Sequence, residues 1–233
     1  MTAQLNPRGD VAVLVAAAGA GVRLGPGGPK ALRRLAGEPL LVHAIRRVAA
    51  APSVRTIVVA APAADTPAVR ELLASVAPVI VVAGGAQRQQ SVAAALAAVP
   101  AGPTIILVHD AARSLAPALL VESVAAAVRS GADAVIPVLP VVDTIKRVDP
   151  DGAVLDTVDR SVLRAVQTPQ GFRRVVLEAA HASAGDPLTD DAGLVERQGV
   201  AVVCVPGSDH AMKITRPIDL VLAEHLLSHP GAR

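Results

Sequence analysis

The stretch VAVLVAAAGAGVRLGPGGPK, residues 11–30, decides the fold that the rest of the chain must complete. Val11 to Val15 form a short, valine-rich apolar run, which is typical of a buried strand. From Ala17 to Lys30 the chain is rich in glycine, which lets backbone N–H groups approach an anion. Because parallel sheets bind ligands at the carboxyl ends of their strands, the stretch predicts an anion-binding loop at such an edge.

Two common phosphate-binding motifs do not match this loop. A dinucleotide-binding motif needs a third glycine where Leu24 stands. A Walker A motif needs glycine before its lysine and serine or threonine after it, whereas Pro29 and Ala31 flank Lys30. The loop therefore predicts phosphate binding of another kind, and a flexible Gly/Pro turn is the alternative.

The rest of the chain continues the alternation of strand and helix. Further buried strands are predicted at Thr56 to Ala60, Val79 to Val82, Thr104 to His109, Ala134 to Val138 and Ala201 to Val205. Helices are predicted at Pro39 to Ala50, Pro67 to Ser75 with Thr66 as N-cap, Gln89 to Ala98, Pro117 to Arg129 followed by Gly131, Arg173 to about Ala182, and Pro217 to Leu227. The pattern predicts an α/β fold with a mostly parallel twisted sheet and helices on both faces.

One segment, residues 141–170, breaks the alternation. It contains two short extended runs separated by the turn sequence Asp149 to Gly152, which predicts a β-hairpin arm. A lone hairpin cannot bury its own apolar face, so we expect the arm to pack on a second copy of the chain in a homodimer. The length then predicts a single domain, residues 1–233, from which residues 141–170 protrude.

Composition excludes several functions. Apolar residues make up 52% of the chain, which is enough for a packed core. Phe172 is the single aromatic residue and the formal net charge is +2, so we expect no nucleic-acid partner. No apolar run is long enough to span a bilayer, so no membrane partner is expected. Cys204 cannot form an internal disulfide, which favours the cytoplasm; the alternative, a signal peptide over Arg8 to Ala18, is better explained as strand and loop.

The few lysines indicate candidate phosphate ligands. Of 22 basic residues, 19 are arginine and three are lysine: Lys30, Lys146 and Lys213. Since arginine serves as the general surface cation here, the lysines are candidates for compact charges beside phosphate oxygens, with coincidence as the alternative.

A charged cluster, His109 to Arg113, follows the fourth predicted strand. Asp110 could accept a bond from a sugar hydroxyl or hold a metal-bound water, and Arg113 could bind a phosphate; a local Asp110–Arg113 ion pair is the alternative. We expect His109 to be a structural hydrogen-bonding residue rather than a base. Asp190 and Asp191 are expected to stabilise a helix N-terminus and not to bind a metal.

Eight motifs together resemble one known family. They are AAGAGVRLGPGGPK from residue 17, GGAQRQQS from 84, HDAAR from 109, DTIK from 143, TVDR from 157, QTPQ from 167, TDDA from 189 and MKITRP from 212. In order and spacing they resemble the 2-C-methyl-D-erythritol 4-phosphate cytidylyltransferases of the non-mevalonate isoprenoid pathway. The resemblance implies a Rossmann-like nucleotidyltransferase that transfers CMP from CTP to a sugar-alcohol phosphate and releases pyrophosphate. It also implies Mg²⁺ or a similar divalent cation, bound mainly through the CTP phosphates, with no metal ligands from the protein.

The same resemblance implies roles for individual residues. Arg160, on the arm, is expected to reach into the site of the neighbouring subunit. The implied catalytic residues are Arg23, Lys30, Arg160 and Lys213. The implied nucleotide-binding residues are Ala17, Ala18, Gly19, Gly21, Gly84, Ser91 and Asp110. The implied acceptor-binding residues are Asp110, Ala111, Arg113, Thr144, Arg160, Thr168 and Lys213.

Two positions depart from the family pattern. Ala16 stands where members often have proline, and Ala86 stands where several have aspartate. Both positions concern the base and the ribose, so we expect cytosine to be recognised through the backbone. The acceptor would be a phosphate monoester, largely a dianion at neutral pH, so the reaction needs no general base and no role for His109.

Three other functions remain open at this point. The nearest is a cytidylyltransferase that acts on ribitol 5-phosphate. A purine-specific sugar-phosphate nucleotidyltransferase is the second. The third is a nucleotide-binding regulator on the same fold that catalyses nothing.

Overall fold

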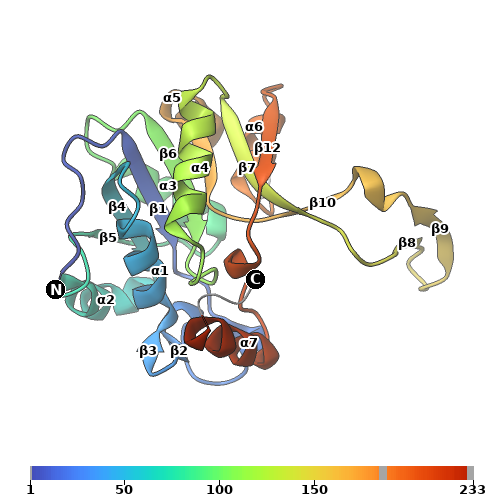
Figure 1. Cartoon of the computed structure of the whole chain (residues 1–233), viewed down its shortest axis with the longest axis horizontal. Helices are drawn as coiled ribbons and strands as arrows, with labels where there is room; N and C mark the ends of the chain where they lie inside the picture. The colour runs from blue at the N-terminus through green and yellow to red at the C-terminus, as the bar shows by residue number, and fades with distance from the viewer. Residues whose placement is uncertain (1, 184–187, 230–233) are drawn as a thin grey trace.

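The computed structural model describes residues 2–183 and 188–229. A central sheet carries helices on both faces, and an arm extends away from it (Figure 1). The strand order in the sheet is β10-β7-β11-β6-β1-β4-β5, and β12 also pairs with β7. These strands are β1 (Val11–Ala16), β4 (Val54–Ala61), β5 (Ile80–Ala83), β6 (Ile105–Asp110), β7 (Ala134–Pro140), β10 (Arg164–Val166), β11 (Gln170–Arg173) and β12 (Val202–Pro206).

The strand directions confirm the predicted mostly parallel sheet. β1 runs parallel to β4 and β6, β4 to β5, and β12 to β7. β10 and β11 run antiparallel to β7, and β11 is also antiparallel to β6. The register pairs Ala16 with both Ala60 and Asp110, so the strand ends carrying the glycine-rich loop and the HDAAR motif lie at one edge.

The helices form two layers because their apolar faces pack on opposite sides of the strands. One buried cluster joins alternate β1 residues, such as Val13, to α1, α2 and α4; the other joins the intervening residues, such as Leu14, to α3, α5 and α6. The helices are α1 (Leu40–Ala49), α2 (Thr66–Ala74), α3 (Arg88–Ala97), α4 (Ala118–Arg129), α5 (Arg174–Ala182), α6 (Asp191–Glu196) and α7 (Pro217–Ser228). Among the helices of the described residues, none combines the length and the apolar composition that a membrane crossing requires.

A smaller apolar cluster brings the end of the chain to the glycine-rich loop. Leu24 of the loop packs with Ile214, and the same cluster includes Leu35, Leu40 and Ala223 of α7. Two short strands, β2 (Arg34–Leu35) and β3 (Glu38–Pro39), form a hairpin beside it. This packing places Lys213, the neighbour of Ile214, at the same sheet edge as the loop.

The predicted hairpin is present in the arm. β8 (Ile145–Val148) and β9 (Val154–Val158) pair with each other in a separate two-stranded sheet. Gly152 closes the turn between them with a φ of 87°, in the region that favours glycine. The hairpin and the short helix η4 (Arg160–Val162) stand away from the main sheet in Figure 1. Residues 164–170, expected to be part of the arm, instead return to the main sheet as β10 and the start of β11.

Other differences from the predicted elements are local. Thr66 is the first residue of α2 and not its N-cap; its hydroxyl donates to the carbonyl oxygen of Pro62. β11 and the β2–β3 hairpin were not predicted, because each is short and shows no clear periodicity. The helix start predicted at Asp190 and Asp191 is present as α6. The other strand and helix boundaries differ by at most two residues from the predicted ones.

Candidate active site

A pocket of about 300 Å³ opens where β1 and β6 end. The glycine-rich loop forms one wall, the start of α3 a second, and the segment around Lys213 a third. Among the residues expected to act in the site, those that line the pocket are Ala17, Ala18, Gly19, Gly21, Arg23, Lys30, Ser91, Asp110, Ala111 and Lys213. The structure therefore gathers residues from four of the eight motifs around one cavity.

The glycine-rich loop folds back on itself and brings Lys30 to the pocket. The backbone N–H of Lys30 donates to the carbonyl oxygen of Gly19 (3.1 Å). Gly21 has a φ of 72°, and a Cβ atom there would lie 2.5 Å from the Cβ of Lys30. Glycine is therefore required at position 21 for both reasons. Arg33 donates to the carbonyl oxygen of Gly25 (2.9 Å) and supports the loop from outside.

Lys30 stands among other cations. Burial lowers its pKa to about 8, and the positive charges of Lys213 and Arg23 contribute to the decrease. Asp110 and Asp219 oppose it in part. Positive charge gathered in this way is unfavourable in the free protein and favours a polyanionic ligand.

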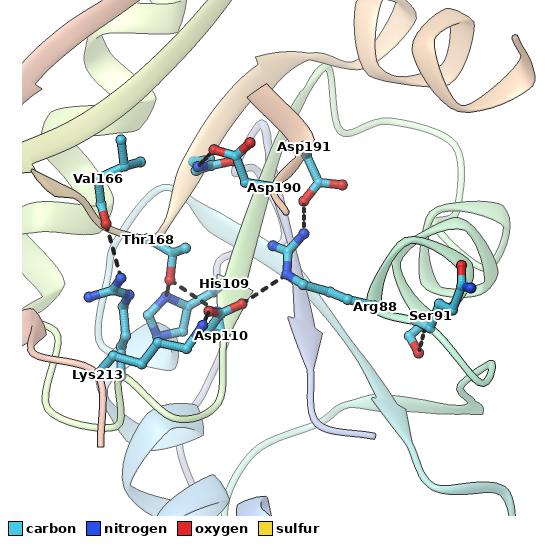
Figure 2. Close-up of polar contacts among 12 residues, drawn as sticks. Arg88, Ser91, His109, Asp110, Val166, Thr168, Asp190, Asp191 and Lys213 are labelled. Atoms are coloured by element: carbon cyan, nitrogen blue, oxygen red, sulfur yellow. Dashed lines mark hydrogen bonds and ion pairs between the residues drawn. The ribbon is translucent and has the colours of Figure 1, made fainter. Parts of the chain in front are cut away.

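Asp110 lies between two cations. Its Oδ1 accepts from Nε of Arg88 (3.1 Å), and its Oδ2 pairs with Nζ of Lys213 (2.7 Å), as Figure 2 shows. Burial alone would raise the pKa of this carboxyl, but Arg88 and Lys213 outweigh burial and hold the pKa well below its usual range. Asp110 is therefore ionised at neutral pH, and the ion pair with Arg113 that sequence left open is replaced by these two.

Arg88 was not predicted as a site residue, although it lies in a motif used for the resemblance. It is the first residue of α3 and lines the pocket. It also pairs with Asp191 through Nη1 (2.5 Å). Burial would lower its pKa, but the two carboxylates outweigh burial and raise the pKa. An arginine in the first turn of a helix, where the helix dipole disfavours a cation, is a signal that could have identified it.

His109 and Thr168 hold the end of β6. Nδ1 of His109 shares a hydrogen bond with the hydroxyl of Thr168 (3.0 Å), which also accepts from the backbone N–H of Asp110 (3.0 Å). Burial lowers the pKa of His109 to about 4, so the imidazole is neutral at pH 7. The expected structural role of His109 agrees with this geometry. Thr168 was expected to line the acceptor pocket, but it is buried behind Asp110, and its hydroxyl is occupied.

Arg113 is also held by the fold. Its Nη1 donates to the carbonyl oxygen of Ala211 (2.7 Å), and its Nη2 donates to that of Val166 (3.0 Å). Burial lowers its pKa. The side chain therefore ties the base of the arm to the segment before Lys213, and both its terminal nitrogens are engaged.

The arm residues lie apart from the pocket of their own chain. Thr144 precedes β8, and Arg160 begins η4 and donates to the carbonyl oxygen of Val142. Neither lines the pocket of the described chain. Lys146, a candidate phosphate ligand, donates instead to the hydroxyl of Thr157 within the hairpin (2.5 Å). Lys30 and Lys213 meet at the pocket, whereas Lys146 lies on the arm, and its role as a phosphate ligand stays a prediction.

Gly84, Ala18 and Ser91, which are expected to bind the nucleotide, pack closely against one another. A Cβ atom on Gly84 would lie 2.7 Å from the Cβ of Ala18 and 2.8 Å from Oγ of Ser91. The backbone N–H groups of Ala17 and Gly84 donate to the carbonyl oxygens of Ala60 and Ala61. The N–H groups at positions 17 and 84 are therefore occupied within the fold; Ala17 lines the pocket, whereas Gly84 packs against the lining residues Ala18 and Ser91 without lining it.

The described residues contain no cluster of three or more His, Cys, Asp or Glu side chains that could hold a metal. Asp110 is the one acidic side chain among the described residues that line the pocket. Mg²⁺ often keeps several waters and binds one or two carboxylates together with substrate phosphates. This donor set fits an ion held chiefly by a phosphorylated ligand.

Comparisons with known proteins agree on one family. Residues 11–229 match the family described as "IspD: 2-C-methyl-D-erythritol 4-phosphate cytidylyltransferase". A protein of that name from Frankia casuarinae is 56% identical, over 96% of this chain and 82% of its own length. A second, from Saccharopolyspora erythraea, is 55% identical over 94% of this chain and all of its own. A crystal structure of the Thermus thermophilus protein of that name is 36% identical, with a TM-score of 0.76, and covers 94% of this chain and 99% of that one.

Proposed function

This chain belongs to the 2-C-methyl-D-erythritol 4-phosphate cytidylyltransferase family, and from that premise we propose which of its residues carry out the reaction. The protein transfers CMP from CTP to 2-C-methyl-D-erythritol 4-phosphate, giving 4-diphosphocytidyl-2-C-methyl-D-erythritol and pyrophosphate. The observation that carries the assignment of residues is the pocket that Arg23, Lys30, Lys213 and Asp110 line together.

The chemical obstacle is repulsion between two anions. An oxygen of the acceptor phosphate attacks the α-phosphorus of CTP, and the bond from that phosphorus to the oxygen bridging to the β-phosphorus breaks. The electron pair leaves with pyrophosphate. Because the attacking phosphate is already largely a dianion near pH 7, no side chain has to remove a proton. Catalysis then depends on position and on fixed positive charge.

Lys30 and Arg23 are the proposed cations of the triphosphate. Both belong to the glycine-rich loop, whose fold brings Lys30 beside Gly19 and Gly21. A triphosphate at this loop would raise the pKa of Lys30 back toward its ordinary value, because negative charge favours the ammonium form. The carbonyl oxygens of Ala17 and Gly84, with Ala18 and Ser91, are proposed to bind the cytidine.

Lys213 and Asp110 are the proposed acceptor residues of the same chain. Lys213 is 41% exposed on its side chain and lies at the pocket, so an incoming phosphate can reach its ammonium. Asp110 remains ionised, so its carboxylate can accept a hydrogen bond from a hydroxyl of the acceptor. Ala111 follows Asp110 in the pocket wall.

Arg160 and Thr144 are proposed to complete the acceptor site of a second subunit. The arm exposes Val148, Val154 and Leu155, which a lone chain leaves in water. A homodimer would cover them and would carry Arg160 away from its own pocket toward the pocket of the partner. The separation of Arg160 from the pocket of its own chain supports this arrangement.

Mg²⁺, or a similar divalent cation, is proposed to bind mainly through the phosphates of CTP. When bound, it would neutralise part of the phosphate charge. We also propose a cytoplasmic location, supported by Cys204, which as the single cysteine of the sequence cannot form an internal disulfide.

Purified protein, CTP, Mg²⁺ and 2-C-methyl-D-erythritol 4-phosphate provide the test. We expect release of pyrophosphate together with the cytidine diphosphate product, and loss of both when EDTA removes the metal. Parallel reactions with ribitol 5-phosphate, and with ATP or GTP in place of CTP, test the alternative enzymes. Binding of CTP without its consumption under all conditions would contradict the assignment and favour a regulator.

A further inference from the structure

Arg88 lines the pocket, yet the roles proposed above leave it without a function. Its position is electrostatically costly in two respects. It occupies the first turn of α3, where the helix dipole disfavours a cation, and its side chain is only 25% exposed. A cation placed in this way persists when carboxylates compensate for the lost hydration.

Two carboxylates provide this compensation from different parts of the chain. Nε of Arg88 lies 3.1 Å from Oδ1 of Asp110, and Nη1 lies 2.5 Å from Oδ2 of Asp191 (Figure 2). The planar guanidinium therefore bridges the end of β6 and the start of α6. Because the fork of donors is rigid, fixing one end of the guanidinium also fixes the direction of the other.

Asp191 contacts the guanidinium of Arg88 from a position outside the pocket. Its side chain is 1% exposed, and it does not line the cavity within the described residues. Its second oxygen, Oδ1, lies 3.1 Å from Nε2 of His181 on α5. Asp191 is thus anchored between α5 and Arg88, and within the described residues Arg88 is the contact that connects its side chain to the pocket.

Asp110 connects the fixed guanidinium of Arg88 to Lys213 at the pocket. One of its oxygens faces Arg88 and the other faces Lys213. If Arg88 lost Asp191, Asp110 would be the remaining carboxylate in this cluster, and it would be drawn toward Arg88 and away from Lys213. The ammonium of Lys213 would then lose the contact that orients it.

We propose that Asp191 is a positioning residue for the transfer reaction: through Arg88 it fixes the Asp110 carboxylate in the orientation that holds the Lys213 ammonium at the pocket. The inference rests on the proposed roles of Asp110 and Lys213. It assigns to the TDDA motif a part in acceptor binding, in addition to the start of a helix.

Steady-state kinetics of Asp191→Asn test the proposal, because asparagine keeps the size of the side chain and removes its charge. We expect kcat/KM for the acceptor phosphate to fall about tenfold, while KM for CTP stays within about twofold of the wild type. In an Arg88→Gln background, Asp191→Asn should cause no further loss, since its effect passes through Arg88. Unchanged acceptor kinetics, or additive losses in the double variant, would overturn the proposal.

Asp190→Asn is the matched control. Asp190 caps the same helix by accepting from the backbone N–H of Gly193 (3.2 Å) and from Gln170 (2.8 Å), and it does not contact Arg88. Because asparagine caps a helix about as well as aspartate, this variant should keep a near-wild-type melting temperature and acceptor kinetics within about twofold of the wild type. An equal kinetic loss in both variants would indicate a general role of α6 and would overturn the proposal.

Three further variants keep the proposal testable. If Asp191→Asn does not fold, Arg88→Lys keeps the charge and loses the fork, and it should show the same selective loss for the acceptor; wild-type acceptor kinetics would overturn the proposal. Asp110→Asn and Lys213→Ala are measured alongside. Full activity in both would mean that the proposed site is wrong, whereas their loss with normal Asp191→Asn kinetics would refute the positioning role alone.

Discussion

Lys30 titrates in the range where the reaction can be measured. Because its pKa is lowered to about 8, the free protein loses this ammonium as pH rises above 8. We expect kcat/KM for CTP to decline through that range, since this parameter reports ionisations of the free enzyme. Lys30→Arg, which stays protonated, should move the decline to higher pH, and Lys30→Ala should lose about 100-fold in turnover. Near-normal turnover of Lys30→Ala in pyrophosphate-release assays would contradict its catalytic role.

Because the pKa of His109 is lowered in the folded protein, we expect the free energy of unfolding to depend on pH. Its pKa is about 4 in the folded protein, against an ordinary value of 6.5, so the unfolded state binds the proton more readily between these values. Stability from this residue is therefore complete above pH 6.5 and decreases by about 3 kcal/mol as pH falls to 4. Asp110, whose pKa is lowered from 3.8, adds a loss only below that pH.

Urea unfolding at several pH values checks this prediction. His109→Gln should flatten the change in unfolding free energy between pH 6.5 and 4. The exposed residue His225 on α7 provides a control variant, His225→Gln, which should keep the wild-type slope. An identical slope in wild type and His109→Gln would mean that His109 is not the group responsible.

Some site residues could be predicted from the sequence, and others could not. Lys30 and Asp110 each follow a predicted strand, and parallel strands bring their ends to one edge. Arg88 was missed because its partners Asp110 and Asp191 lie 22 and 103 residues away and show no shared pattern. Arg113 was predicted to bind a ligand; in the structure its two terminal nitrogens donate to backbone carbonyl groups, and no sequence motif reveals these contacts.

At the level of elements, the junction between β5 and α3 depends on Gly84. An alanine Cβ there would come within 2.8 Å of both Ala18 and Ser91, so one wall of the pocket would have to move. We expect Gly84→Ala to raise KM for CTP several-fold and to lower the unfolding free energy by about 1–3 kcal/mol. Nucleotide titration and urea unfolding measure the two effects. A fully active variant of wild-type stability would show that the wall adapts to the added methyl group.

The predictable elements are those with strong periodicity. β1, β4 and β6 are apolar runs buried on both faces, and α4 repeats apolar residues at helical spacing. β11 was missed because it has four residues, includes Gly171, and gains its partners β6 and β7 from distant segments. α6 has six residues with Gly193 among them, so periodicity could not predict it, and the acidic pair Asp190 and Asp191 was the signal that predicted its start.

At the level of the whole molecule, mixing two inactive variants tests the exchange of arms. Arg160→Ala and Lys213→Ala are each expected to be inactive. If Arg160 acts in the neighbouring site, a mixed dimer holds one site with both residues intact, so random mixing should recover about a quarter of wild-type activity. Co-refolding the two variants and assaying product formation checks this. No recovery, despite mixed dimers in native mass spectrometry, would contradict action across subunits.

Arg113 connects the root of the arm to the segment that carries Lys213. Its guanidinium grips the backbone of Val166, where the arm rejoins the sheet, and that of Ala211, two residues before Lys213. A shift of β10, which contains Val166, would therefore be transmitted through Arg113 to the segment that carries Lys213. In the proposed homodimer, the position of the arm on its partner would therefore also affect the position of Lys213.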